Sequence, residues 1–257
     1  MIGTHQKKTV SLFFIDTSSP ILSQTALNQC INGFHFDEIL VFTNQPAYYP
    51  GQKCIQIPTL TSSESYSNLL INKIPDYIST DFIIIAHYDG FILNSQEFSP
   101  SFFHYDYIGA PWPNWNTHNV GNGGFCWRSK KLCHSIRDIN RGLPVGVPED
   151  LFICRLHRDL LEEKFGCRFA DAAIASHFSF EMTIPPFQTF GFHGSRHLPA
   201  IYRHNLDHLI QHIPDRLIVE GEEFYSEVLK ISPDSASALK KIIATRTDAA
   251  KKARVTL

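Results

Sequence analysis

The chain has 257 residues, of which 43% are hydrophobic and 19% are charged. This length and composition are ordinary for a globular α/β protein, and they supply enough apolar material for a sizeable core. Lysine and arginine number 23 against 25 acidic residues, so the formal net charge is -2. Such a balance excludes a broad positive surface for nucleic acid or anionic membranes, although it allows a local basic groove for a phosphate group.

Cysteine usage and hydropathy indicate a cytoplasmic protein. The six cysteines form no C-x-x-C pair and no zinc-type spacing with histidine, which is typical of reduced thiols. The apolar stretch at residues 10–15 is too short for a signal peptide or a membrane span. We therefore expect no transmembrane segment, and contact with the inner face of the membrane would be peripheral.

Four short apolar segments are typical of buried strands. They lie at residues 10–15, 38–43, 54–57 and 82–86. The last of them, Phe-Ile-Ile-Ile-Ala, is the most apolar run in the chain and leads directly into His-Tyr-Asp-Gly.

Two helices are expected between these strands. Ser19 and Pro20 are typical of a helix cap and a first helical position, apolar residues then recur at helical spacing, and Gly33 suits the end. A second helix is expected over about residues 63–78, with Pro75 near its end. The alternation predicts an α/β fold with a mostly parallel sheet flanked by helices, and ligands bind at the carboxyl ends of such strands.

The pattern changes after Gly90. Residues 108–124 are rich in Trp, Pro, Asn and Gly, as loops are, and a helical stripe of apolar residues follows Glu149. The end of the chain is rich in Ala and Lys and is expected to be helical. Because no repeat or low-complexity linker intervenes, we expect one domain over residues 1–231 and a C-terminal helical extension over residues 232–257.

Several common catalytic motifs are absent from the sequence. There is no P-loop, no complete G-x-G-x-x-G fingerprint, no H-E-x-x-H and no G-x-S-x-G. ATPases, dehydrogenases, zinc proteases and α/β-hydrolases are therefore disfavoured.

The first motif that can carry chemistry is His87-Tyr88-Asp89, at the end of the most apolar strand. A carboxylate there projects into the ligand crevice, where it can hold Mn²⁺ or Mg²⁺. Such a divalent metal stabilises a departing diphosphate as a Lewis acid. Asp89 followed by Gly90 also fits a simple turn, so this motif alone leaves both interpretations open.

Three later motifs also allow both a structural and a functional interpretation. Residues 120–125 bring three glycines close together, which suits either a ligand-binding loop or a surface turn. Glu149 and Asp150 open a helix, where acidic residues are favoured by the helix dipole but can also accept a proton from a hydroxyl. His193 lies between glycines and aromatic residues, in a loop that either presents an imidazole to a metal or simply hydrogen-bonds.

In this order, the motifs resemble the pattern of GT-A glycosyltransferases, which have a D-x-D-like motif, a glycine loop, an x-E-D motif and a late metal-binding histidine. Residues 105–112 (Tyr-Asp-Tyr-Ile-Gly-Ala-Pro-Trp) and 178–181 (Phe-Ser-Phe-Glu) strengthen the likeness. Together they resemble an uncharacterised bacterial and fungal family, labelled a domain of unknown function and grouped with glycosyltransferases. The resemblance covers about residues 82–194.

The resemblance implies a GT-A-like, Rossmann-like fold and a role for each matching residue. Asp89 and His193 would bind the metal, and His87 stands where a carboxylate is usual. Asp150 would be the catalytic base, with Glu149 as its neighbour. The donor and acceptor pocket would be lined by Gly121, Asn122, Gly123 and Gly124.

Six further residues are candidates for donor or acceptor binding: Asp16, Thr17, Tyr88, Trp112, Arg128 and Glu181. Asp16 and Thr17 follow the first strand, where the nucleotide base and ribose would lie. Trp112 either stacks on a sugar or pins its loop to the core. Arg128 either pairs with a phosphate or serves a structural role. Glu181 either positions the acceptor or the metal shell, or hydrogen-bonds inside the core.

The sequence thus predicts metal-assisted transfer of a sugar, with inversion, from a nucleotide-sugar donor, favoured as UDP-linked, to a glycan or other hydroxyl acceptor. A sugar-1-phosphate nucleotidyltransferase is disfavoured because residues 16–20 (Asp-Thr-Ser-Ser-Pro) replace the Gly- and Arg-rich loop expected after the first strand. A non-catalytic glycan- or nucleotide-binding module is favoured by the non-acidic His87 and opposed by the intact Glu149, Asp150 and His193. No nucleic-acid partner is expected.

Overall fold

The computed structural model describes residues 7–255, without the side chains of residues 218–220 and 248–255. Two compact units are distinguished, one ending at His193 and the other beginning at Gly194. Residue 232, where we expected an extension to begin, lies within the second unit, immediately before helix α11 (Pro233–Val255).

The first unit is built on a six-stranded sheet with the order β3-β2-β1-β4-β8-β5. The strands are β1 (Val10–Asp16), β2 (Glu38–Thr43), β3 (Lys53–Gln56), β4 (Phe82–Ala86), β5 (Tyr107–Ile108) and β8 (Cys126–Ser129). All pairs among β1 to β4 are parallel, whereas β8 is antiparallel to both β4 and β5. The predicted mostly parallel α/β sheet is therefore confirmed.

The central strands β1 and β4 are buried along their whole length. A strand that is buried on both faces needs apolar residues at every position rather than at alternate positions. Their sequences, Val-Ser-Leu-Phe-Phe-Ile-Asp and Phe-Ile-Ile-Ile-Ala, meet that requirement except at Ser11 and Asp16, and Leu12 is paired to Ile84 across the ladder. The carboxyl ends of β1, β2 and β4 consequently meet at one edge of the sheet.

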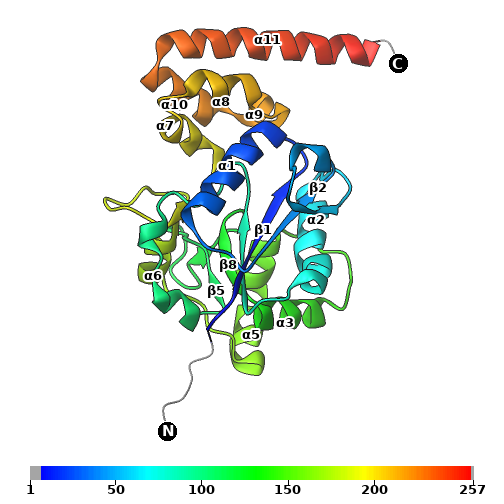
Figure 1. Cartoon of the computed structure of the whole chain (residues 1–257), viewed down its shortest axis with the longest axis vertical. Coiled ribbons are helices and arrows are strands. Elements are labelled where there is room, and N and C mark those ends of the chain that lie inside the picture. The colour runs from blue at the N-terminus through cyan, green and yellow to red at the C-terminus, as the bar shows by residue number, and fades with distance from the viewer. Residues whose placement is uncertain (1–6, 256–257) are drawn as a thin grey trace. The chain divides into compact units, whose positions relative to one another are not determined.

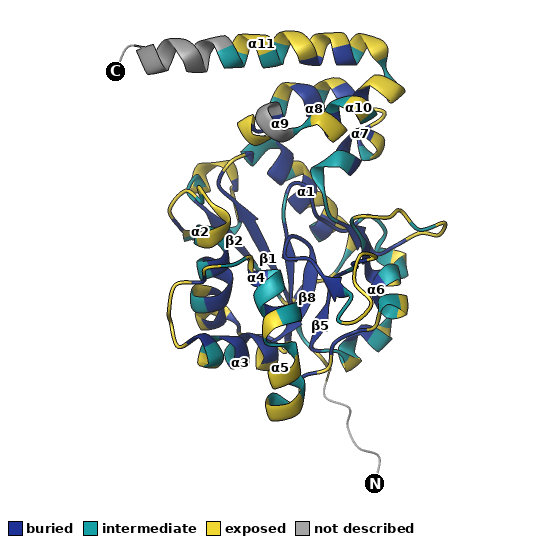
Figure 2. Ribbon diagram, turned by 180° about the vertical axis from the view of Figure 1, so that it is seen from behind, coloured by how far each residue is buried: buried dark blue, intermediate teal, exposed yellow. Residues whose placement is uncertain are grey.

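Helices flank this sheet. They are α1 (Pro20–Gly33), α2 (Ser63–Asn68), α3 (Lys130–Asn140), α4 (Glu149–Leu151), α5 (Arg158–Phe165) and α6 (Ala172–Phe178). A π turn (Leu69–Lys73) and a 3-10 turn (Ile74–Tyr77) continue α2, and a second π turn (Phe152–Leu156) continues α4. Figures 1 and 2 place α2 and α3 to one side of the strands and α6 to the other.

Helix α1 begins and ends where the sequence predicts, but its start is held differently. The side chain of Ser19 makes no capping hydrogen bond. Instead, Oδ1 of Asp16 accepts from the backbone N–H groups of Ser18 and Ser19, at 3.0 and 2.8 Å. The turn between β1 and α1 is therefore fixed by the last residue of the strand.

Two small ladders and several short turns complete the first unit. The ladders are β6 (Ala110–Pro111) with β7 (Val120–Gly121), which is antiparallel, and β9 (Ser179–Phe180) with β10 (Gly191–Phe192), which is parallel. The 3-10 turns of this unit outside the helical runs are Pro46–Tyr48, Ser95–Glu97 and Pro100–His104. Beside β10, Phe125 stacks on Phe178 with ring centroids 5.1 Å apart, so much of the phenylalanine content forms core.

The second unit is helical. It contains a 3-10 turn (Ser195–His197), α7 (Leu198–Ile201), α8 (Leu206–His212), α9 (Asp215–Glu220), α10 (Glu222–Ile231) and α11. Helix α10 packs against α7 and α11, and its Phe224 and Val228 are buried. Across the residues that the structure describes, we find no helix that is both long and apolar enough to cross a membrane.

Candidate functional site

The segment after β4 is a tight turn that also buries a carboxylate. The N–H of His87 donates to the carbonyl of Gly90 at 2.7 Å, and the N–H of Gly90 donates back at 3.2 Å. Tyr88 and Asp89 lie at the corner and are only 6% and 3% exposed. The sequence left two interpretations of this segment, a simple turn and a ligand site. The two are compatible, because the turn fixes the position of Asp89.

His193 is the last residue of the first unit, and its side chain lies beside the turn that contains Asp89. It directly follows β10, and its backbone N–H donates to the carbonyl of Phe180 on β9 at 2.9 Å. A bridge between Ile92 and Gly191 attaches β10 to the chain just beyond the Asp89 turn. Residues about a hundred positions apart in sequence are thereby brought together.

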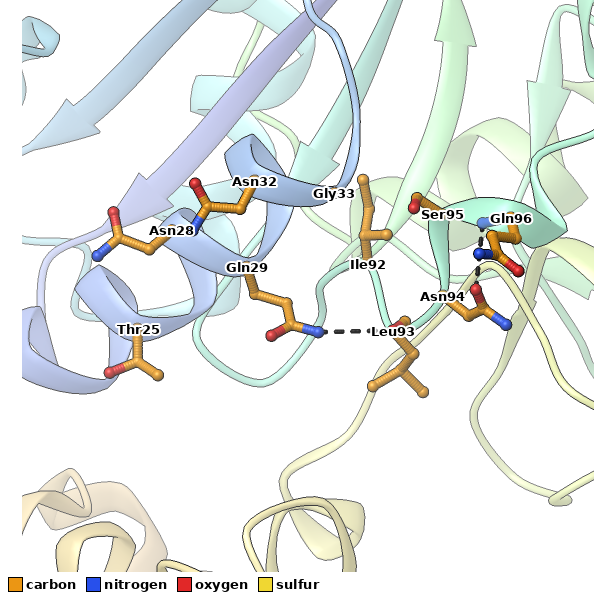
Figure 3. Close-up of a pocket in the computed structure, with 10 residues that line it drawn as sticks. All are labelled: Thr25, Asn28, Gln29, Asn32, Gly33, Ile92, Leu93, Asn94, Ser95 and Gln96. Atoms are coloured by element: carbon orange, nitrogen blue, oxygen red, sulfur yellow. Dashed lines mark hydrogen bonds between the residues drawn. The ribbon is translucent and has the colours of Figure 1, made fainter.

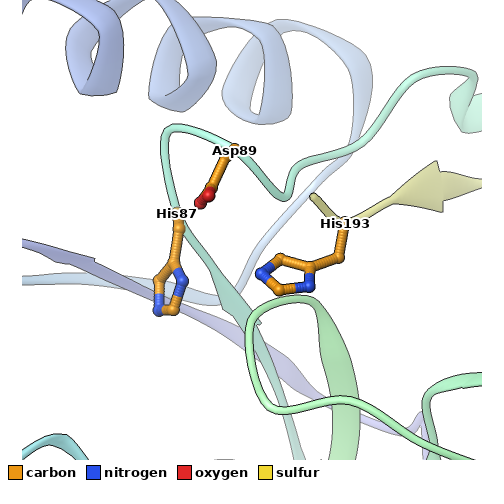
Figure 4. A group of neighbouring side chains, drawn as sticks. All are labelled: His87, Asp89 and His193. Atoms are coloured by element: carbon orange, nitrogen blue, oxygen red, sulfur yellow. The ribbon is translucent and has the colours of Figure 1, made fainter. Parts of the chain in front are cut away.

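His87, Asp89 and His193 form a cluster whose ligand atoms all lie within 4.8 Å of one another. Figure 4 shows the two imidazole rings turned toward each other, with the Asp89 carboxylate beside the space between them. The Nδ1 atom of His193 is 2.9 Å from Oε1 of Glu181. Two imidazoles and a carboxylate form a donor set that suits Mn²⁺ better than Mg²⁺, which prefers oxygen ligands alone.

The glycine loop packs against this cluster. A Cβ atom added at Gly124 would overlap the His193 ring, and one added at Gly123 would overlap the Glu149 carboxylate. These two positions must therefore be glycine for both side chains to approach. Asn122 precedes them with φ of 97°, and its Oδ1 accepts from the N–H of Gly124 at 2.7 Å. The side chain of Asn122 thus holds the loop in this unusual conformation.

Arg128 and Glu149 form a buried ion pair behind the loop. Their side chains are 1% and 4% exposed, and Nη2 of Arg128 lies 2.9 Å from Oε1 of Glu149. Burial raises the pKa of the Glu149 carboxyl, and the adjacent guanidinium opposes this rise. Arg128 belongs to β8 and Glu149 to α4, so the pair joins the sheet to the helix that carries Asp150.

Asp150 is half-buried at the second position of α4. One of its oxygens, Oδ1, accepts from the backbone N–H of Leu151 at 2.7 Å. Burial raises the pKa of this carboxyl and the negative charge of Glu181 raises it further, whereas the Leu151 N–H and the positive charges of Arg128 and His193 lower it. A carboxylate with a raised pKa is suited to accepting a proton near neutral pH.

The residues predicted after β1 are engaged inside the protein. Oδ2 of Asp16 accepts from the hydroxyl of Tyr49 at 2.8 Å, in addition to the two turn N–H groups. The Thr17 hydroxyl oxygen accepts from the N–H of Leu60 at 3.1 Å. Both side chains therefore fix the neighbouring turns.

Trp112, a further candidate for donor or acceptor binding, is 5% exposed and packs against Gly121. Of the two interpretations that the sequence allowed for Trp112, this arrangement corresponds to pinning of the loop.

One residue of the site was missed by sequence reasoning. The hydroxyl of Tyr66 on α2 lies 2.9 Å from Nε2 of His87 and 3.0 Å from the carbonyl oxygen of Gly123. Tyr66 belongs to no motif, and its position in a helix does not distinguish it from other residues in the sequence. Its contacts in the structure are what place it at the site.

A separate groove of about 490 Å³ lies between α1 and residues 92–96 (Figure 3). Five of its lining residues carry carboxamides: Asn28, Gln29, Asn32, Asn94 and Gln96. None of its lining residues is charged. The groove therefore offers only neutral hydrogen-bonding groups, and the candidate site is the cluster at the edge of the sheet.

Comparisons with known proteins leave the function open. A family model described as "Protein of unknown function (DUF5672)" matches residues 52–193, slightly more than half of the chain. A mycobacterial protein of solved structure is similar over 49% of this chain and about half (54%) of its own, with 10% identity and a TM-score of 0.34. The mannosyltransferase PcManGT from Pyrobaculum calidifontis, solved in complex with GDP-Man and Mn²⁺, is similar over 98% of this chain and 81% of its own, with 11% identity and a TM-score of 0.46. No curated protein matches the chain.

The close approach at Gly124 predicts an asymmetry between two glycine substitutions. Gly124→Ala should lower the free energy of unfolding by about 1–3 kcal/mol, because the added methyl group overlaps the His193 ring. Gly146→Ala is the matched control, because open space surrounds that position, and it should be neutral or slightly stabilising. Urea unfolding of both variants measures the difference, and equal stabilities would contradict the described packing.

The buried ion pair predicts a second contrast. Glu149→Ala leaves the Arg128 guanidinium buried and unpaired, so it should lower the free energy of unfolding by about 3–5 kcal/mol. Glu162→Ala removes a more exposed partner of Arg158 and should cost at most about 1 kcal/mol. Chemical denaturation monitored by fluorescence measures both, and a small loss for Glu149→Ala would mean that the pair is solvated.

Proposed function

Since the chain belongs to a family of proteins of unknown function, DUF5672, we propose its function from its own site: metal-assisted transfer of a sugar from a nucleotide-sugar donor to a hydroxyl acceptor. The observation that carries this proposal is the cluster of His87, Asp89 and His193 at the carboxyl end of β4, with Asp150 within electrostatic reach of His193. Ligands of parallel α/β sheets bind at that edge.

The cluster supplies the ligands for a divalent metal. His87, Asp89 and His193 would hold Mn²⁺, and Glu181 would orient the His193 ring through Nδ1. A metal held there would neutralise the negative charge that develops on the departing diphosphate. The buried turn keeps Asp89 fixed, so the protein side of the site needs little rearrangement when a ligand binds.

Asp150 is proposed as the base that accepts the proton of the acceptor hydroxyl. The deprotonated oxygen then attacks the anomeric carbon as the bond to the diphosphate oxygen breaks, which inverts the configuration. Glu149 is less suited to this role, because its carboxylate is buried and paired with Arg128. We assign Glu149 the task of positioning α4, and Asp150 the proton transfer.

A UDP-linked donor and a glycan or other hydroxyl acceptor remain the proposed substrates, and we propose a GT-A-like relationship for the fold. All six cysteines are free, which supports a cytoplasmic site of action, with peripheral contact if the acceptor is lipid-linked.

Metal binding is predicted to depend on this cluster alone. Wild-type protein should bind Mn²⁺ in a calorimetric titration, and Asp89→Asn should abolish measurable binding because the carboxylate charge is lost. His118→Ala provides a matched control, since His118, Asp159 and Glu162 form a second, more exposed group of this kind. Binding that survives Asp89→Asn but disappears in His118→Ala would move the metal to the other group.

If Asp150 is the base, replacing it should reduce turnover without changing donor binding. Asp150→Asn should reduce release of nucleoside diphosphate from nucleotide sugars by about 10²–10⁴-fold while leaving donor affinity unchanged. In the wild type, kcat/KM should fall on acidification at a pH above about 4, where an ordinary aspartate titrates, because burial raises the pKa of Asp150. Full turnover in Asp150→Asn would refute the assignment.

A further inference from the structure

Tyr66 connects the metal cluster to the glycine loop through a short hydrogen-bond chain. Its hydroxyl is 2.9 Å from Nε2 of His87 and 3.0 Å from the carbonyl oxygen of Gly123. The two rings also pack edge to face, with centroids 5.2 Å apart and planes at 76°. Two kinds of contact therefore fix the orientation of the tyrosine ring relative to the imidazole.

The direction of these hydrogen bonds follows from the chemistry of the groups. A carbonyl oxygen only accepts, so the single proton of the Tyr66 hydroxyl is donated to Gly123. The hydroxyl oxygen must then accept from His87, which requires a hydrogen atom on Nε2. A neutral His87 in this state carries its lone pair on Nδ1.

His193 is held in the opposite state. A carboxylate only accepts, so Glu181 requires a hydrogen atom on Nδ1 of His193, and the neutral form of this ring carries its lone pair on Nε2. That edge of the ring lies against Gly124. The rings of His87 and His193 face each other in Figure 4, with centroids 6.4 Å apart. The two imidazoles would therefore offer different nitrogen atoms to one ion.

We propose that Tyr66 is a positioning residue, which holds His87 in the Nε2–H tautomer so that Nδ1 is presented to a divalent cation at Asp89. The part concerning the cation rests on the proposed function, whereas the tautomer follows from the hydrogen bonds of Tyr66. Without Tyr66, the acceptor that favours the Nε2–H tautomer of His87 is lost, and the fraction of molecules that present Nδ1 should fall.

Two features suit Tyr66 to this task. Burial raises the pKa of its phenol well above the ordinary range, and the charge of Glu149 acts in the same direction, so the hydroxyl stays protonated. Its helix is also anchored at the start, where the side chains of Ser62 and Ser65 form a reciprocal capping box. The Tyr66 hydroxyl therefore keeps its proton for the hydrogen bond to the carbonyl oxygen of Gly123, and its helix holds it in position.

Nitrogen-15 NMR of the imidazole rings tests the tautomer directly. In metal-free protein at a pH where His87 is neutral, long-range proton–nitrogen spectra should show the Nε2–H form, with the signals assigned by their loss in His87→Ala. Tyr66→Phe should convert His87 to a mixture of tautomers and leave His193 unchanged. Tyr77→Phe removes a hydroxyl from an exposed tyrosine on the adjacent turn and should alter neither.

The wild-type spectrum decides the proposal even if Tyr66→Phe folds poorly, because a His87 ring in the Nδ1–H form would overturn it. An unchanged tautomer in folded Tyr66→Phe would overturn it as well.

Calorimetric titration then tests the consequence for the cation. Mn²⁺ affinity should fall about 10–100-fold in Tyr66→Phe, which is typical when the hydrogen-bond partner of a metal ligand is removed. If wild-type protein binds no Mn²⁺ while the tautomer responds to Tyr66→Phe, the proposed function fails and the positioning role of Tyr66 stands. If Mn²⁺ binds equally well to both proteins, the proposed function survives and the role of Tyr66 in presenting Nδ1 is refuted.

Discussion

The absence of a Cβ atom at Gly123 and Gly124 is the constraint on which the candidate site depends. At these two positions the backbone passes so close to Glu149 and His193 that a methyl group would overlap either side chain. The loop thus lies between two groups of side chains and keeps them adjacent. His193 of the His87–Asp89–His193 cluster lies against Gly124, and the buried carboxylate of Glu149, which begins the helix of Asp150, lies against Gly123.

The acidic groups near this loop differ in environment. Asp89 is buried in a tight turn, Glu149 is buried against a guanidinium, and Asp150 is half-buried with only a backbone N–H in direct contact among the hydrogen bonds described for it. Of the two neighbouring carboxyls of α4, Glu149 is engaged in an ion pair and Asp150 is in none among the described residues, which is why the proposed function gives the proton transfer to Asp150.

Sequence alone predicted the parts of the fold that depend on local periodicity. Strands β2 and β4 and helix α1 have the predicted limits, because continuous apolar runs and helical spacing are local signals. The sequence also predicted that Asp89 and His193 would lie together as candidate metal ligands, and the structure brings them together at the carboxyl end of β4. The strand β8 was not predicted, because residues 126–129 are too few to show a period and lie beside a glycine-rich loop.

Side-chain partnerships were harder to predict than elements. Arg128 was a candidate for phosphate binding, yet it lies 1% exposed against Glu149, 21 positions away. Tyr66 was not singled out at all, although it contacts both His87 and Gly123. Such pairings are set by how β8, α2 and α4 pack together, and no residue pattern within any one of these segments encodes them.

We propose that the cluster at the end of β4 forms a metal-dependent site for a nucleoside diphosphate group. Calorimetric titration of UDP and, separately, GDP into the protein, with and without Mn²⁺, tests this most directly. At least one nucleotide should bind only when Mn²⁺ is present, and that binding should be lost in Asp89→Asn. Nucleotide binding that is indifferent to both Mn²⁺ and Asp89, or no binding under any condition, would refute a metal-dependent nucleotide site at this cluster.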